Sequence, residues 1–179
     1  SALMLSGCGA EKKLKKGEKY LAVGEYYDAA TQFKRAYQRT APKEREQRGK
    51  IALKVAYCNE RINSTQKAIA AYSNAIRYNQ ASTQDRLNYA RLLLKNGAYK
   101  QAETEFRAVL DSMPDNVLAK NGLASAENAP LWKKEGSRYQ VKRMDVFNSR
   151  RADYSPVLGG DQYDYLYFTS TRNDATGNE

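Results

Sequence analysis

GAYKQAETEFRAVLDSMP, residues 97–114, is the stretch that decides the fold of this chain. A glycine turn is followed by one amphipathic helix, in which Ala102 and Phe106 share a face, and a proline ends the helix. The same pattern occurs at residues 67–76, with a spacing of 34 residues, and a third copy occupies residues 24–36. Such a repeat predicts an array of helix pairs in which each pair packs on the next.

The composition favours a folded protein without catalytic chemistry. The 179 residues are 41% hydrophobic and 28% charged, which is too apolar for wholesale disorder. The chain has no histidine and only two cysteines, so the commonest general base and the usual zinc ligands are missing. We therefore predict that the protein is not an enzyme and holds no cofactor or metal. The net charge of +10 includes basic clusters at residues 12–19 and 43–54, which attract anionic partners.

The repeat predicts about three helix pairs followed by a capping helix over residues 11–130. The first helix of the array is expected from Glu11, and the capping helix from Val117 to Ala126, before Pro130. The pattern resembles the tetratricopeptide repeat family, although Lys16 stands where that family usually has a large apolar residue. The fold class of these residues is accordingly mainly α, an α-solenoid. Between the first two repeats the step is longer, so we expect an extended loop or helix start near residues 40–47.

The resemblance implies a ligand groove on the concave face, where the first helices of successive pairs lie. Aligned on the repeated alanines, its exposed positions are Lys50, Tyr57, Arg61, Arg91 and Lys95. Such a groove is basic with one aromatic residue, and it suits an acidic or C-terminal peptide segment. The carboxylate clamp of chaperone-binding relatives is not reproduced, because Leu14 and Glu18 occupy two of its positions. A solvated charged face without a dedicated ligand is the alternative. Cys58 lies on the apolar stripe and is expected to be buried and unreactive.

The first ten residues resemble the end of a bacterial lipoprotein signal peptide. Leu5-Ser6-Gly7-Cys8 has the pattern of a lipobox, and the resemblance implies that Cys8 carries the lipid. Residues 1–10 are then a signal remnant and lipid-anchor site, and the lysines that follow would lie near anionic head groups. An apolar terminus that matches by chance is the alternative.

The character of the sequence changes after Pro130. Residues 131–150 are predicted to be a linker, and residues 151–179 to be an incomplete first blade of a WD40-like β-propeller. Tyr154-Ser155-Pro156 and the stretch from Leu166 to Arg172 carry the resemblance to that family. A single blade does not close a propeller, so further blades are expected beyond this stretch. A β-hairpin packed on the helices is the alternative.

In this order, the three segments resemble the start of the PorE-like, OmpA-family outer-membrane lipoproteins of the type IX secretion machinery of Bacteroidetes. The resemblance implies a non-enzymatic scaffold at the periplasmic face of the outer membrane, docking protein partners of a secretion or envelope complex. Peptidoglycan would be bound only by a domain not present in this chain. A soluble cytosolic adaptor for acidic peptides is the alternative. Nucleic-acid binding is not predicted, because the basic residues lack an aromatic stacking ladder. Calcium binding at Asp161, Asp164 and Asp174 is a weaker alternative, since no EF-hand spacing is present.

Overall fold

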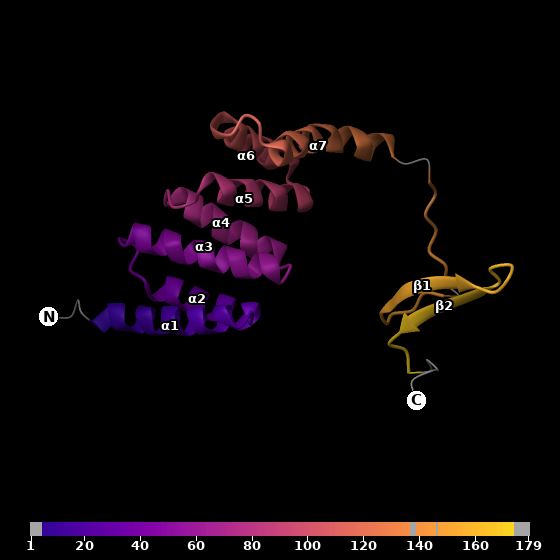
Figure 1. Ribbon diagram of the computed structural model, residues 1–179, viewed down its shortest axis with the longest axis horizontal. Helices are drawn as coiled ribbons and strands as arrows, with labels where there is room; N and C mark the ends of the chain where they lie inside the picture. The colour runs from indigo at the N-terminus through magenta and orange to yellow at the C-terminus, as the bar shows by residue number, and fades with distance from the viewer. Residues whose placement is uncertain (1–4, 137–138, 146, 174–179) are drawn as a thin grey trace. The chain divides into compact units, whose positions relative to one another are not determined.

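The chain folds as two compact units that divide after Gly136, and each is described by itself. The computed structural model describes residues 5–136, 139–145 and 147–173, with the backbone alone for residues 5–8. In this part of the chain the first unit is built from helices and the second contains two strands (Figure 1). The helices are α1 (Leu5–Ala22), α2 (Tyr26–Arg39), α3 (Arg45–Arg61), α4 (Thr65–Arg77), α5 (Thr83–Lys95), α6 (Tyr99–Ser112) and α7 (Val117–Glu135).

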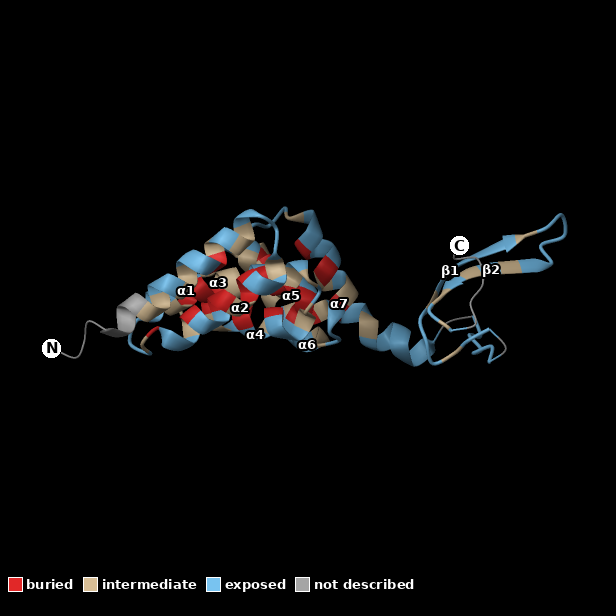
Figure 2. Cartoon of the chain, turned by 90° about the horizontal axis from the view of Figure 1, so that it is seen from below, coloured by how far each residue is buried: buried red, intermediate tan, exposed pale blue. Residues whose placement is uncertain are grey.

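Successive helices pack as pairs, α1 with α2, α3 with α4 and α5 with α6, and α7 packs on α6. The second helix of one pair also contacts the first helix of the next, so the pairs stack into a solenoid. Figure 2 separates α1 and α3 from α2, α4 and α6, which lie in a second layer. We call the outer surface of α1, α3 and α5 the odd-helix face. The predicted three pairs and capping helix are confirmed.

The turn inside each pair requires a left-handed backbone at one equivalent position. Gly24 has φ +78° and Gly97 has φ +79°, a conformation that glycine adopts without steric penalty. In the second pair the same position is Asn63, with φ +58°. Asparagine is one of the few other residues that tolerate this region, so the turn is kept without glycine.

The alanine and aromatic positions of the repeat form the core, as predicted. The buried residues that recur from pair to pair are Ala29, Phe33, Ala36, Ala68, Tyr72, Ala75, Ala102, Phe106 and Val109. Small alanines let the helices approach closely, and the ring beside them fills the remaining space. Gly17 on α1 marks one such close approach, because a Cβ there would lie 2.5 Å from Cε1 of Phe33.

The extra residues between the first two repeats lie at the start of α3. This helix has 17 residues and α5 has 13, so the extra residues lengthen the helix as expected. Arg48 in the added turn donates to the carbonyl O of Thr40 at 2.8 Å. Its guanidinium also lies over the Tyr37 ring, with 4.1 Å from Cζ to the centroid. The insertion thereby ties the start of α3 to the end of α2.

Two helix ends differ from the prediction. α1 begins at Leu5 rather than at Glu11, and Gly9 lies beside Arg39 of α2, so packing on the second helix supports turns that glycines do not favour alone. α7 continues through Pro130 to Glu135, so the residues from 131 to 135 are helix and not linker. Proline removes one backbone hydrogen bond there, and the helix ends instead at Gly136, which has φ +72°.

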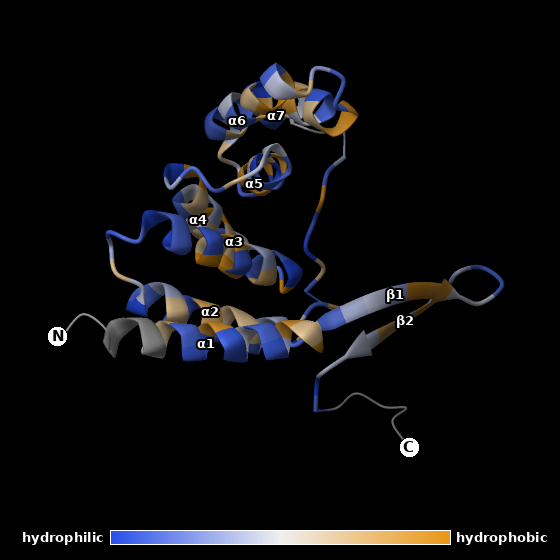
Figure 3. Cartoon of the chain, turned by 60° about the vertical axis from the view of Figure 1, so that its left-hand side comes forward, coloured by the Kyte–Doolittle hydropathy of each residue, from blue (hydrophilic) through white to orange (hydrophobic). Residues whose placement is uncertain are grey.

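The second unit contains an antiparallel hairpin of β1 (Asp153–Gly159) and β2 (Tyr165–Ser170) (Figure 3). Asp153 pairs with Ser170 and Gly159 with Tyr165, and the register shifts between Tyr154 and Val157. Propeller blades usually have four strands. The described residues contain two, so the structure shows a hairpin and no propeller.

A polar network closes the open end of this hairpin. The Ser170 hydroxyl donates to Oδ1 of Asp153 at 2.6 Å, and Arg172 donates to both carboxylate oxygens at 3.1 and 3.0 Å. The backbone N–H of Ser149 donates to Oδ2 at 3.0 Å. These hydrogen bonds hold the pKa of the Asp153 carboxyl well below its usual range, and those from Arg172 and then Ser170 have the largest effect.

Candidate protein-docking surfaces

The five predicted groove residues are all exposed, three on α3 and two on α5. They do not form one continuous patch of free charge. Lys50 makes an ion pair with Glu46, one turn earlier on the same helix. Nearby, Lys54 of α3 pairs with Glu18 of α1 at 2.7 Å. The start of α3 is therefore of mixed charge, because Lys50 and Lys54 already have carboxylate partners.

Tyr57 and Arg61 are brought together by a residue that sequence reasoning missed. The Tyr26 ring meets Tyr57 edge to face, with centroids 6.1 Å apart and an interplanar angle of 72°. The Arg61 guanidinium lies over the same Tyr26 ring, at 5.4 Å from the centroid. Such contacts hold the side chains in one arrangement. The Tyr26-Tyr27 dipeptide at the start of α2 could have indicated an aromatic contact site. The sequence does not give its partners, because Tyr26 belongs to the first helix pair and contacts Tyr57 and Arg61 of the second.

Arg91 and Lys95 lie together at a hollow of about 300 Å³ between the end of α3 and α5. Glu60, Asn63 and Thr65 line its other side. Lys95 donates to the side-chain oxygen of Asn63, whereas Arg91 makes no ion pair within the described residues. The hollow therefore presents one unpaired guanidinium beside polar groups.

Glu60 at this hollow is fixed from the core side. The Tyr72 hydroxyl donates to its Oε2 at 2.8 Å, and the Tyr72 ring is buried. Burial, and then the hydrogen bond and charge of Glu60, raise the pKa of Tyr72 above its usual value. One carboxylate oxygen is thus already used within the fold, and its position is set by α4.

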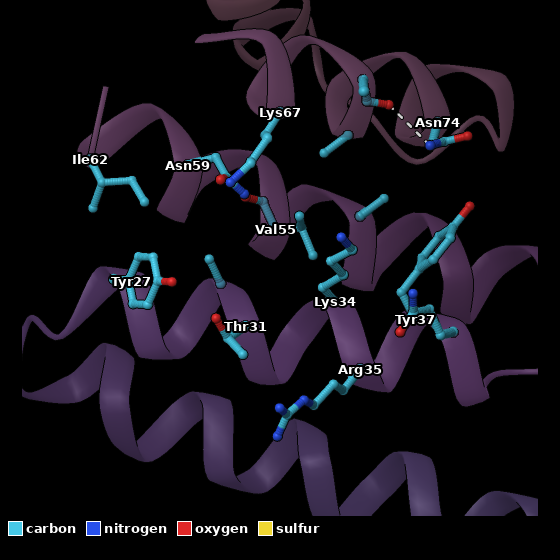
Figure 4. A pocket seen from close by; sticks show the side chains of 15 residues that line it. Tyr27, Thr31, Lys34, Arg35, Tyr37, Val55, Asn59, Ile62, Lys67 and Asn74 are labelled. Carbon is cyan, nitrogen blue, oxygen red and sulfur yellow. Dashed lines mark hydrogen bonds between the residues drawn. The ribbon is translucent and has the colours of Figure 1, made fainter. Parts of the chain in front are cut away.

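A larger hollow, of about 580 Å³, opens between α2 and α4 with α3 as its floor (Figure 4). We call it the α2–α4 groove. It is lined by Tyr27, Ala30, Thr31, Lys34, Arg35, Tyr37, Gln38, Ala52, Val55, Asn59, Ile62, Lys67, Ala70, Ala71 and Asn74. None of the residues on this list belongs to the predicted groove. The signal that could have found it is the composition of α4, which has small residues at Ala70 and Ala71, two cations and no acid.

Cys58 is buried, as predicted. Its side chain has no measurable exposure, and burial raises its pKa to about 11. The thiolate form that reacts with electrophiles is therefore scarce at neutral pH. Cys8, the predicted lipid site, lies outside the residues whose side chains are described, and so do residues 1–4 of the apolar terminus.

No group of three or more histidine, cysteine, aspartate or glutamate side chains is placed to hold a metal ion in the described ranges. Asp174 of the calcium alternative falls beyond those ranges. Among the helices described, none has the length and apolar character needed to cross a membrane.

Sequence comparison agrees with the helical repeat. A family profile described as Tetratricopeptide repeat matches residues 63–126, from the turn of the second pair into α7. A curated protein, DnaJ homolog subfamily C member 3 of Rattus norvegicus, is 28% identical over 153 residues. The match covers 83% of this chain and 27% of that protein, so the chain spans about a quarter of the length of this relative.

Solved structures share the fold at low sequence identity. The first tetratricopeptide domain of Spaghetti (RPAP3), bound to the HSP90 peptide SRMEEVD, is 18% identical with a TM-score of 0.56, covering 73% of this chain and 99% of that one. MamA of Desulfovibrio magneticus RS-1 is 15% identical with a TM-score of 0.58 and coverages of 73% and 71%. The Sgt2 domain of Aspergillus fumigatus is 15% identical, with a TM-score of 0.52 and coverages of 79% and 91%. Residues 63–126 thus match the tetratricopeptide repeat family, and the helical unit as a whole has the tetratricopeptide repeat fold.

Proposed function

We propose that this chain is a non-enzymatic scaffold that docks a protein partner on its odd-helix face. The observation that carries the proposal is the hollow at Arg91 and Lys95, where one guanidinium has no ion-pair partner in the described part of the chain. Stacked helix repeats present extended surfaces of this kind to peptide segments. An acidic segment suits the site, because its carboxylate would pair with Arg91 while Lys95 and Asn63 supply further donors.

The peptide SRMEEVD, bound to the related Spaghetti domain, is a suitable first probe because it is acidic. We expect a fluorescein-labelled SRMEEVD with a free C-terminus to bind with a dissociation constant of about 10 to 500 μM, a weak peptide complex. Arg91→Glu with Lys95→Glu should weaken binding at least about tenfold. The matched control is Lys133→Glu with Lys134→Glu, which makes the same change of charge at the exposed end of α7. Equal losses in both variants would contradict docking at this hollow.

The location of this scaffold is a separate part of the proposal. We propose that Cys8 carries a lipid and anchors the chain to the periplasmic face of the outer membrane, within a type IX secretion-type complex. The Leu5-Ser6-Gly7-Cys8 lipobox supports the anchor. The order of lipobox, helical repeats and blade-like hairpin supports the complex. Exposed apolar side chains on the hairpin, such as Val157 and Tyr167, suit a blade that packs on further strands.

Metabolic labelling with a fatty-acid analogue tests the anchor. The protein expressed with its natural leader should incorporate the label, and Cys8→Ser should abolish it. Label that survives Cys8→Ser, or no label at all, would favour the alternative of a soluble cytosolic adaptor. The repeat fold it shares with Sgt2 and Spaghetti is compatible with that alternative too. Peptide binding does not depend on the outcome, so the two parts of the proposal fail separately.

A further inference from the structure

The α2–α4 groove has the form of a binding site and a chemistry that the odd-helix face lacks. Its floor is made of small and medium apolar side chains, including Ala52 and Val55 of α3. Its volume of about 580 Å³ lies in the range of small-ligand sites. Along α2 it extends from Tyr27 to Gln38, a rise of about 16 Å, which matches about five residues of extended chain.

The charged groups of this groove are of one sign. Figure 4 shows Lys34 of α2 and Lys67 of α4 extending into the space between the two helices, whereas Arg35 points away from it toward α1. No aspartate or glutamate is among the lining residues. Both lysines are exposed, and neither makes an ion pair or hydrogen bond with a described residue. Their charge is therefore uncompensated by the fold.

The odd-helix face differs in this respect. Lys50 is paired with Glu46, Lys54 with Glu18, and Lys95 with the Asn63 side chain. A ligand carboxylate arriving at these three lysines competes with bonds that already exist, and among the described residues the free cation of the hollow on that face is the single guanidinium of Arg91. In the α2–α4 groove a carboxylate meets two free ammonium groups above an apolar floor, where partial exclusion of water strengthens the attraction.

Further donors line the groove without internal partners. Tyr27, Thr31 and Gln38 make no hydrogen bond with the described residues through their side chains, and all three stand along α2. Asn59 and Asn74 instead use their amides on backbone carbonyls of their own helices. One wall thus offers groups for the backbone of a ligand, and the lysines face each other across the gap.

We propose that the α2–α4 groove binds a short acidic segment of a partner protein in extended form. Its carboxylates pair with Lys34 and Lys67, and an apolar side chain between them rests on the alanine floor. The site is separate from the hollow at Arg91 and Lys95, and it does not depend on docking there. A chain with both sites engages two segments at once, one on each layer of the solenoid.

The test uses the whole chain and a peptide blocked at both ends, Gly-Glu-Glu-Leu-Glu-Glu-Gly with a fluorescein label, followed by fluorescence anisotropy. We expect Lys34→Glu with Lys67→Glu to weaken binding at least about tenfold. The matched variant, Lys133→Glu with Lys134→Glu at the exposed end of α7, carries the same charge change and should stay within about twofold of the native chain. The peptide with glutamine for every glutamate should not bind. Far-UV circular dichroism verifies that both variants are folded.

A second variant tests the groove by shape and not by charge. Ala70 lines the groove and is exposed, so Ala70→Trp fills part of the space without entering the core. Ala70→Trp should weaken binding of the peptide as Lys34→Glu with Lys67→Glu does. Equal losses in the two charge variants, binding of the glutamine peptide, or no binding at millimolar protein would each overturn the inference. The SRMEEVD measurement with Arg91→Glu and Lys95→Glu decides the proposed function independently, since it reports on the other layer.

Discussion

In the helical unit the centre of each pair is removed from water, with Phe33, Phe106 and Ala102 fully buried. In the second unit none of the described residues from 139 to 173 is buried, and the hairpin is closed by the bonds that Asp153 receives. A two-stranded hairpin without an apolar face covered by other structure is marginally stable at best. One unit is thus stabilised by packing and the other by a few polar contacts, and each kind of stability fails under different conditions.

Substitution of Phe106 is the strongest test of the claim that packing stabilises the helical unit. Its ring is fully buried and meets Gly122 of α7, so it joins the last pair to the capping helix. Phe106→Ala should lower the free energy of unfolding of the helical unit by about 3–5 kcal/mol, because a cavity replaces the ring. Urea denaturation followed by circular dichroism at 222 nm measures it. Phe168→Ala in the hairpin is the control and should leave this transition unchanged. A loss below about 1 kcal/mol for Phe106→Ala would mean that the solenoid end is not held by its core.

The claim that polar contacts hold the hairpin is tested by Asp153→Asn. The amide keeps the shape of the side chain but loses the charge that Arg172 and Ser170 hold. We expect the hairpin to open while the helical unit unfolds at the same urea concentration as before. The Thr171 amide, which donates to the carbonyl O of Ala152 at 3.0 Å, should lose its protection in NMR hydrogen exchange. Asp161→Asn in the turn is the matched control, and retained protection in Asp153→Asn would contradict the network's role.

These two sites also differ in how far the sequence predicts them. The core positions follow from a 34-residue period, since a buried alanine or ring recurs wherever two helices must approach. Phe33, Tyr72 and Phe106 could therefore be placed in advance. The extension of α7 past Pro130 could not, because the local signal for a helix end was overridden by a glycine stop six residues later.

The docking surfaces were harder to predict for a physical reason. The alignment gives which residues are exposed on α3 and α5, and it placed Arg91 and Lys95 beside each other. It does not tell which cations are already paired, because Lys95 meets Asn63 from another repeat. The α2–α4 groove depends on the space left between two helices of different pairs, and no local pattern records that space.

Low pH should destabilise the hairpin more than the helical unit, without any substitution. The pKa of Asp153 is lowered in the folded hairpin, so its contribution to stability is complete above its usual value of about 3.8 and is lost as the pH falls through the folded value. Amide chemical shifts of the hairpin should begin to move toward unfolded positions below about pH 4 and should move further as the pH falls. Helical amides should move less over this interval. Asp153→Asn removes the pH dependence of the hairpin, and hairpin chemical shifts that stay unchanged from pH 4 down to about pH 1 would contradict the assignment.

The smallest effect expected is at Tyr72, where a buried ring makes a partly buried hydrogen bond within the packed unit. Tyr72→Phe removes the bond to Glu60 and keeps the ring, and Glu60 stays accessible to water, so the loss at pH 7 should be about 1 kcal/mol. Since the pKa of Tyr72 is raised by burial, its contribution is present below the unfolded value near 10 and is lost as the pH rises above it. The stability difference between the native chain and Tyr72→Phe should therefore shrink between pH 9 and pH 11, as measured by urea denaturation at each pH. Tyr57→Phe, on an exposed ring, serves as the control and should show no such change. A constant difference across this range would mean that the Tyr72 hydroxyl reaches solvent, and that the helical unit is less completely packed than its other core residues indicate.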